Sequence, residues 1–205
     1  MYYSQLKLNL HSPRVRKDLA NTYDMHKRIY SAFGYPLSSS ERILYRVEDY
    51  YFEKPPSVIV QSLTKPDWSV LDVSTSIREP YVLDIKTKQA EVEFMNGESY
   101  KFRLVVDVTE NKEGHSYRLI IDEKEQLDWL KKRCGYRGFK LQQVLILGRR
   151  QIEITQRNGN AFYLNAVHFE GILSVEDKDK FTIGYRSGIG HGKGFGMGML
   201  SLIRY

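Results

Sequence analysis

The sequence predicts an α+β fold built from two tandem units, each with the element order strand–helix–strand–strand–helix–strand. Three observations predict it: each half alternates polar and apolar residues with period two, each half has a helical segment after its first strand, and Asn158-Gly159 gives a hairpin signal between two long alternating runs. This βαββαβ order is that of the ferredoxin-like, or RRM-like, domain. The expected domains are 1–90, with the first helix, and 91–205, with a basic face and a glycine-rich loop.

The elements of the first half follow from periodicity and capping. Three leucines alternate with polar residues over positions 6–10, which predicts an opening strand. A helix is predicted from Asn21 to Phe33. Asn21 suits its N-cap, Asp24 favours its first turn, and Gly34 ends it. Further alternating or apolar runs predict strands at Arg42–Tyr51, Ser57–Gln61 and Tyr81–Lys86.

The second half repeats this pattern. The segment Glu123–Cys134 predicts a helix, because Leu127, Leu130 and Cys134 lie along one side of it. A short polar helix is predicted at Asp177–Ser187. The expected strands are Tyr100–Thr109, Val144–Gln156, Ala161–Val175 and Met197–Ile203.

The residue composition of the chain indicates the class of protein to which it belongs. The 205 residues are 41% hydrophobic and 27% charged, which is typical of a globular chain. The single cysteine, Cys134, excludes an intrachain disulfide. The N-terminal residues alternate in polarity and no apolar run approaches the ~20 residues of a membrane span, so we expect a cytoplasmic protein without membrane association. The five histidines are scattered and no Cys-x-x-Cys pair occurs, so no metal and no cofactor is expected.

The net charge of +6 favours an anionic partner. The interval from Lys131 to Arg157 contains eight basic residues and only one acid, Glu153. We expect a basic face there that binds nucleic acid, and the alternative is a solvated face whose lysines complement a helix dipole. The basic residues are Lys131, Lys132, Arg133, Arg137, Lys140, Arg149, Arg150 and Arg157.

Six glycines alternate with other residues near the C-terminus, together with Lys193 and no acid. Bare backbone amides can approach phosphate closely, so the run is either a phosphate cradle or a tight packing device. It is not a Walker loop, because Gly194 rather than Ser or Thr follows Lys193, and it lacks the dinucleotide-binding spacing. The six are Gly188, Gly190, Gly192, Gly194, Gly196 and Gly198.

The first predicted helix contains the residues whose types and spacing most clearly suggest catalysis. Tyr23 and His26 are three residues apart in its first turns, so they share a face where free N–H groups favour a phosphate. A histidine and a phenol beside a phosphate are sufficient for RNA cleavage without metal, in which the ribose 2′-hydroxyl attacks the adjacent phosphorus. Lys27 and Arg28 could stabilise the charge. The alternatives are a core Tyr23 with a surface His26, or His191 of the glycine run as the catalytic histidine.

Several segments together resemble the CasE family of CRISPR-associated endoribonucleases, which process repeat RNA in type I-E systems. They occur in the family's order and span nearly the whole chain. The segments are Arg16–His26, Val60–Ser62, Pro66–Asp72, Lys101–Leu104, Trp129-Leu130, Phe169–Gly171 and Gly188–Leu202.

The resemblance implies two ferredoxin-like domains that bind a repeat hairpin. It also implies cleavage at the 3′ base of the hairpin without metal, leaving 2′,3′-cyclic phosphate and 5′-hydroxyl ends, and retention of the crRNA within the Cascade complex. Tyr23 and His26 match the residues implicated in cutting, and Lys193 matches the lysine of the family's glycine-rich loop. His191 stands where members often have proline.

The leading hypothesis is therefore a metal-independent CRISPR repeat endoribonuclease, monomeric when free, whose partners are the repeat RNA hairpin and other Cascade subunits. We assign His26 as the general acid to the 5′-oxygen and Tyr23 as the group that positions or activates the 2′-hydroxyl, with the opposite assignment open. The competing hypotheses are a non-catalytic crRNA scaffold of the same fold and an unrelated nucleotide-binding domain, which the unmatched glycine motifs disfavour.

Overall fold

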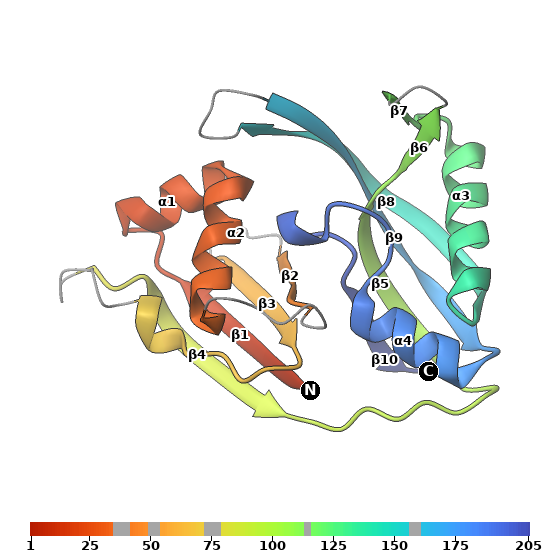
Figure 1. Ribbon diagram of the computed structural model, residues 1–205, viewed down its shortest axis with the longest axis horizontal. Helices are drawn as coiled ribbons and strands as arrows, with labels where there is room; N and C mark the ends of the chain where they lie inside the picture. The colour runs from red at the N-terminus through yellow and green to blue at the C-terminus, as the bar shows by residue number, and fades with distance from the viewer. Residues whose placement is uncertain (35–41, 49–53, 72–78, 113–115, 156–160) are drawn as a thin grey trace. The chain divides into compact units, whose positions relative to one another are not determined.

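The computed structural model describes residues 1–34, 42–48, 54–71, 79–112, 116–155 and 161–205, which form two compact units (Figure 1). The first unit comprises Met1–Val92 together with Ile154–Ala161 and Gly194–Gly196. The second unit comprises Glu93–Glu153, Phe162–Lys193 and Met197–Tyr205.

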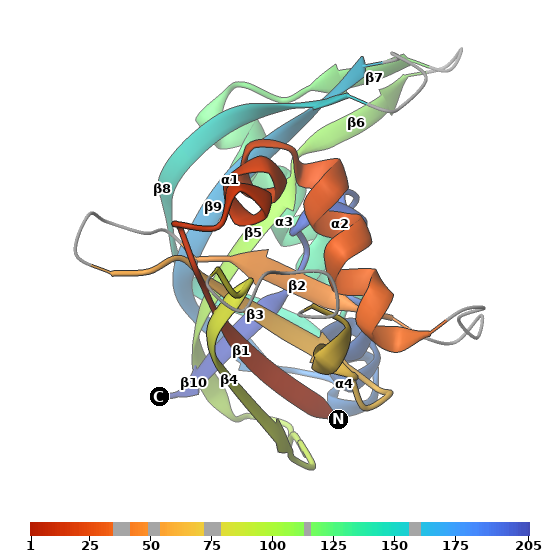
Figure 2. The same ribbon diagram turned by 90° about the vertical axis from the view of Figure 1, so that its left-hand side faces the viewer.

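The first unit contains a four-stranded antiparallel sheet with α1 (Pro13–Ala20) and α2 (Thr22–Tyr30) over one face, as Figure 2 shows from the side. The strand order is β2-β3-β1-β4, which is the order of a ferredoxin-like domain. The 3-10 helices η1 (Ser31–Phe33) and η2 (Trp68–Leu71) precede β2 and β4. The strands are β1 (Tyr2–Leu8), β2 (Leu44–Val47), β3 (Ser57–Ser62) and β4 (Val82–Gln89).

The core of this unit lies between the sheet and α2. Leu6 and Leu8 of β1 point to the helical side, because alternate residues of a strand share a face. Met25 and Ile29 of α2 are four residues apart, so they form one buried stripe that packs in the same cluster. Tyr45 of β2 belongs to this cluster and is fully buried.

Asn21 separates two helices where the sequence predicts only one. Its extended backbone ends α1, and its N–H donates to the Lys17 carbonyl at 3.1 Å. Its side-chain oxygen accepts from the Tyr23 N–H at 3.0 Å, which confirms Asn21 as the N-cap of α2. The predicted helix also ends differently, because η1 replaces its last turn before Gly34.

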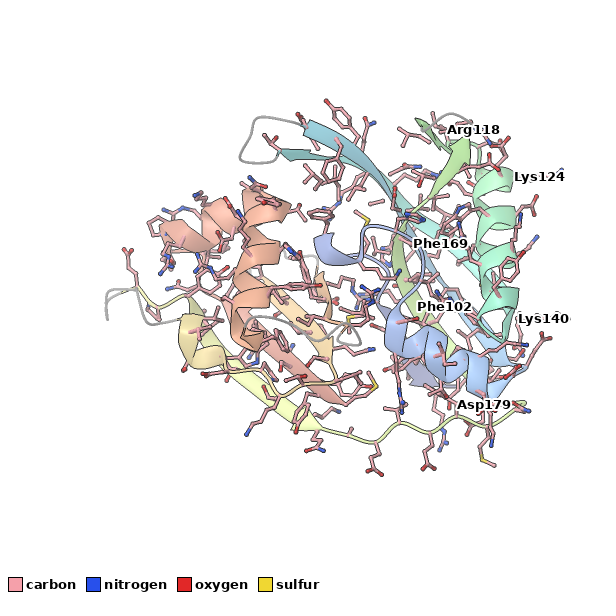
Figure 3. All side chains as sticks on the ribbon, viewed as in Figure 1. Phe102, Arg118, Lys124, Lys140, Phe169 and Asp179 are labelled. Atoms are coloured by element: carbon pink, nitrogen blue, oxygen red, sulfur yellow. The ribbon has the colours of Figure 1, made fainter. Side chains whose placement is uncertain are left out.

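The second unit repeats the fold with the strand order β10-β5-β9-β8 and with two helices, α3 (Glu123–Tyr136) and α4 (Lys178–Ser187). Phe102 and Phe169, labelled in Figure 3, lie on neighbouring strands of the sheet and are buried. A further antiparallel pair of strands, β6 (Thr109–Lys112) and β7 (Ser116–Leu119), follows directly after β5 in the chain. The sequence does not predict this pair. The sheet strands are β5 (Ser99–Asp107), β8 (Phe139–Thr155), β9 (Ala161–Val175) and β10 (Leu200–Arg204).

Both sheets therefore have the ferredoxin-like strand order, and the predicted α+β class is confirmed. Among the residues that the structure describes, no helix is both long and apolar enough to cross a membrane.

A buried ion pair joins the two helices of the first unit. The Asp18 carboxylate accepts hydrogen bonds from Nε of Arg28 at 2.8 Å and from the Tyr81 hydroxyl at 2.9 Å. The side chain of Asp18 is 4% exposed and that of Arg28 is 23% exposed. A buried carboxylate is stable only while such partners remain, so Arg28 holds α2 against α1.

We expect Arg28→Met to lower the free energy of unfolding by about 3 kcal/mol, because it leaves the Asp18 carboxylate buried without its cation. Urea denaturation measures the change. The matched control is Lys17→Met, whose side chain is 74% exposed in its pair with Asp24 and which should change stability by at most about 0.5 kcal/mol. Equal stability of the two variants would show that the ion pair does not hold the helices together.

Candidate active site

The first turns of α2 present Tyr23, His26 and Lys27 to solvent. Tyr23 and His26 are half-buried and lie three residues apart, on the same side of the helix as the sequence predicts. Nζ of Lys27 lies 4.0 Å from the centre of the Tyr23 ring, so an ammonium group sits over the phenol. A phenol, an imidazole and a cation are thus held on two turns of one helix.

Aromatic rings surround the His26 imidazole. The centre of the Tyr30 ring lies 4.1 Å from that of His26, and the Phe195 ring lies at 5.8 Å. Nδ1 of His26 is buried, and no described residue meets hydrogen-bond geometry with it. Nε2 is therefore the ring nitrogen that a substrate can reach.

This environment lowers the pKa of His26 from its ordinary value. Burial is the largest cause, because it penalises the imidazolium. The backbone of Gly194 acts in the opposite direction, and the positive charge of Lys27 lowers the pKa further. At neutral pH the free protein therefore carries mostly neutral His26, which can accept a proton.

The tip of the glycine-rich loop contributes directly to this site. Gly194–Gly196 cluster with the first unit, and a Cβ atom at Gly194 would lie 3.3 Å from Nδ1 and Cε1 of His26. The Tyr45 hydroxyl donates a hydrogen bond to the Gly194 carbonyl at 3.0 Å. The missing side chain at Gly194 thus lets backbone approach the imidazole closely.

The remainder of the loop packs within the second unit. Gly190 has a φ of 75°, and a Cβ atom there would lie 2.3 Å from the side chain of Val106, so only glycine fits. Nζ of Lys193 donates to the Gly190 carbonyl at 2.6 Å, and His191 forms a β-bridge with Asp107. This part of the run is a tight packing element, with Lys193 bonded to its own loop. The other glycines here are Gly188, Gly192 and Gly198.

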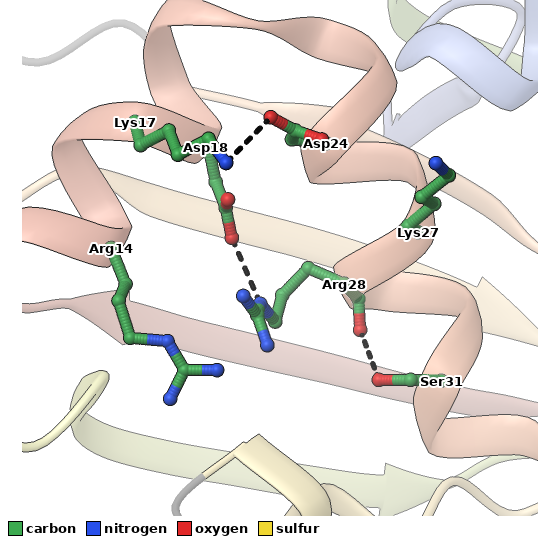
Figure 4. Close-up of a pocket in the computed structure, with 7 residues that line it drawn as sticks. All are labelled: Arg14, Lys17, Asp18, Asp24, Lys27, Arg28 and Ser31. Atoms are coloured by element: carbon green, nitrogen blue, oxygen red, sulfur yellow. Dashed lines mark hydrogen bonds and ion pairs between the residues drawn. The ribbon is translucent and has the colours of Figure 1, made fainter. Parts of the chain in front are cut away.

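A pocket with a volume of about 280 Å³ opens between α1 and α2 (Figure 4). Two carboxylates compensate part of its positive charge, since Arg28 pairs with Asp18 and Lys17 lies 3.6 Å from Asp24. Its four cations exceed its two acids, which suits an anionic group. It is lined by Arg14, Lys17, Asp18, Asp24, Lys27, Arg28 and Ser31.

The predicted basic face of the second unit is divided. Arg149 turns toward α3, where it donates to Gln126 at 2.8 Å and pairs with Glu123 at 2.7 Å. Because neighbouring residues of a strand point to opposite faces, Arg150 lies on the side of β8 opposite to Arg149, and the RNA contacts expected of the two arginines stay predictions. Arg157 lies outside the described residues.

The predicted basic residues of α3 lie on its surface. The Arg133 guanidinium lies 5.2 Å from the Trp129 ring, and Lys131 pairs with Asp128 at 3.4 Å. Lys132 is exposed. In the ranges that the structure describes, no group of three or more His, Cys, Asp or Glu side chains gathers in a way that could hold a metal ion.

Three residues of the His26 environment are absent from the sequence prediction. Tyr30 follows His26 by four residues, so helical spacing could have identified it. Tyr45 and Phe195 are far from His26 in the chain, and no local pattern links them to it.

The comparisons of this chain with known proteins agree on one family. A sequence profile of the family described as CRISPR associated protein matches residues 1–204. The CRISPR-associated endoribonuclease Cse3 of Thermus thermophilus is 33% identical over 215 residues, covering 98% of this chain and 99% of the relative. The Cascade subunit CasE of Escherichia coli K12 is 27% identical, covering 88% and 90%. A solved structure of Cse3 bound to a 19-nucleotide RNA superposes with a TM-score of 0.89 at 32% identity, covering 99% of this chain and all of that one.

We expect Lys27→Met to raise the pKa of His26, because it removes a positive charge that disfavours the imidazolium. Titration of the histidine ring protons by NMR measures the shift. Lys124→Met on α3 of the second unit, labelled in Figure 3, is the matched control and should leave the His26 titration unchanged. A shift of equal size in both variants would mean that net charge, and not Lys27, sets the His26 pKa.

Proposed function

The chain belongs to the CRISPR associated protein family, and on this premise we propose that it is an endoribonuclease that cuts CRISPR precursor RNA at the 3′ base of the repeat hairpin. Its resemblance to the CasE endoribonucleases is confirmed over the full length. The observation that carries the proposal is the presentation of Tyr23 and the half-buried His26 on the first turns of α2, in a chain that matches a named endoribonuclease along its length.

The proposed reaction is an intramolecular transesterification that needs no metal. A base removes the proton of the ribose 2′-hydroxyl, and the 2′-oxygen bonds to the adjacent phosphorus. The bond from phosphorus to the 5′-oxygen breaks, and an acid protonates that oxygen. The products are a 2′,3′-cyclic phosphate and a 5′-hydroxyl, and acid–base help of this kind contributes about 10²–10⁴-fold to the rate.

The lowered pKa of His26 supports the reverse of the assignment preferred from sequence. A neutral imidazole accepts a proton, so His26 takes the proton of the 2′-hydroxyl through Nε2. Tyr23 then serves as the donor to the departing oxygen, since a phenol hydroxyl can donate a proton. Lys27, over the Tyr23 ring, adds positive charge where the phosphate becomes more negative.

The repeat RNA is held mainly through its phosphates, because proteins recognise an RNA duplex by shape and backbone. Lys27 and Arg28 border the basic α1–α2 pocket, beside the proposed catalytic pair. We propose further phosphate contacts for Lys193 of the glycine-rich loop and for the basic residues of the second unit. We propose that the cut RNA stays bound. The protein joins other Cascade subunits, in agreement with a relative that is named a Cascade subunit. The proposed contacts in the second unit are Lys131, Lys132, Arg133, Arg149, Arg150 and Arg157.

The proposal is tested with the protein, its repeat RNA and EDTA. We expect cleavage in EDTA, and none of an RNA with a single 2′-deoxy substitution at the cut site, because the attacking hydroxyl is then missing. Gel analysis of the products and their ends measures both. Tight binding of the unmodified repeat without any cleavage would instead favour the non-catalytic scaffold.

The matched catalytic variants are His26→Ala and His191→Gln. We expect His26→Ala to bind the repeat normally and to cut it about 10²–10⁴-fold more slowly, since it lacks the proposed base. His191→Gln should cut at the normal rate. Full activity of His26→Ala would contradict the catalytic assignment.

The pH dependence of the single-turnover cleavage rate at subsaturating protein, which is equivalent to kcat/KM when product stays bound, identifies the role of His26. As a base it must be neutral, so activity should be full at neutral pH and should be lost as pH falls through its lowered pKa, below about 6.5. His191→Gln should keep this acidic limb. Activity that instead falls as pH rises through the same range would restore His26 as the acid.

A further inference from the structure

A chain of three groups links Tyr45 to His26. The Tyr45 hydroxyl donates to the Gly194 carbonyl at 3.0 Å, and the Gly194 backbone lies against the edge of the His26 ring that carries Nδ1. Tyr45 is fully buried in the core of the first unit. A rigid core residue therefore fixes the position of the loop backbone beside a half-buried imidazole.

Nδ1 of His26 needs a partner that this backbone can supply. The nitrogen is buried, and an unsatisfied buried polar atom is costly. A carbonyl oxygen has two lone pairs, so the Gly194 carbonyl can accept from Tyr45 and from Nδ1–H together. The Gly194 backbone already favours the protonated ring, as expected of a carbonyl near an N–H.

We propose that Tyr45 is a positioning residue for the RNA cleavage proposed above: it holds the Gly194 carbonyl at Nδ1 of His26, keeps the ring proton on Nδ1, and leaves Nε2 unprotonated toward the RNA. In the free protein the Nδ1 contact falls short of a well-formed hydrogen bond. Catalytic hydrogen bonds commonly tighten when substrate binds, and RNA held against α2 completes this one.

The proposal gives the loop tip a chemical role. A neutral histidine works as a base only through the nitrogen that lacks a proton, and the partner of the other nitrogen decides which one that is. A side chain at position 194 would place its Cβ atom 3.3 Å from Nδ1 and Cε1 of His26, so the imidazole would have to shift by a few tenths of an ångström to admit it. The described groups that face His26 are Lys27 and Tyr30 of α2, the Gly194 backbone and the Phe195 ring, and Lys27 is the charged one among them.

Tyr45→Phe removes the hydroxyl and keeps the ring in the core. The test is ¹⁵N NMR of the histidine rings, with and without repeat RNA that carries the 2′-deoxy substitution. We expect the wild-type protein bound to this RNA to carry the His26 proton on Nδ1, and the variant to shift toward the Nε2–H form that neutral histidine prefers in water. With cleavable RNA under single-turnover conditions, because the cut RNA stays bound, the cleavage rate at saturating protein (here kcat) should fall about 10-fold with little change in the half-saturating protein concentration, as for loss of an outer hydrogen-bond partner.

Tyr100→Phe is the matched control, because it removes a tyrosine hydroxyl that bonds Glu98 in the second unit. It should change neither the His26 tautomer nor kcat. Gly194→Ala is a second variant that keeps the Tyr45 hydroxyl, and its methyl group should displace the ring and lower kcat.

An unchanged tautomer and unchanged kcat in Tyr45→Phe would overturn the proposal even if the wild-type protein cleaves RNA. If the wild-type protein binds the repeat but does not cut it, the proposed function fails, while the tautomer measurement still decides whether Tyr45 orients His26.

Discussion

The burial of Met25 and Ile29 against the first sheet is the constraint on which the site depends. These residues form one stripe of α2, so the neighbouring stripe, which carries Tyr23, His26 and Tyr30, is set at the edge of the core. Asn21 starts the helix just before this stripe, and the Asp18–Arg28 pair holds α2 to α1. A helix that rotated by one residue would bury His26 fully or expose it, and either change would alter its pKa.

The intermediate burial of His26 has a chemical consequence. Burial beside the Tyr30 and Phe195 rings and the Gly194 backbone lowers the pKa of the ring, and Nδ1 is the nitrogen that is buried without a hydrogen-bond partner. The glycine run has two functions within this arrangement. The part around Gly190 packs tightly within the second unit, and the Gly194 backbone at the tip lies against the His26 ring. The sequence left two interpretations of the run open, a phosphate cradle and a tight packing device, and the packing around Gly190 agrees with the second.

Much of the fold could be predicted from local patterns. The bounds of β9, the start of α3 at Glu123 and the N-cap of α2 follow from alternation and capping, which act within a few residues. The helix α1 was missed, although Pro13 at its first turn is a start signal, because it adds little apolar periodicity. The hairpin β6–β7 is short and polar, so its pairing has no distinct sequence signal.

The sequence by itself determined the ferredoxin-like fold class, because periodicity and capping are local properties that the chain shows directly. It also indicated the family, through segments that resemble its members in order along the chain, while the catalytic role of Tyr23 and His26 stays a prediction. Only the tertiary structure decided the surroundings of His26 and the separation of Arg149 from Arg150. Desolvation of the His26 ring depends on packing against residues far along the chain, such as Gly194. The side chain of Arg149 turns toward α3 because Gln126 and Glu123 lie there, which strand alternation alone does not show.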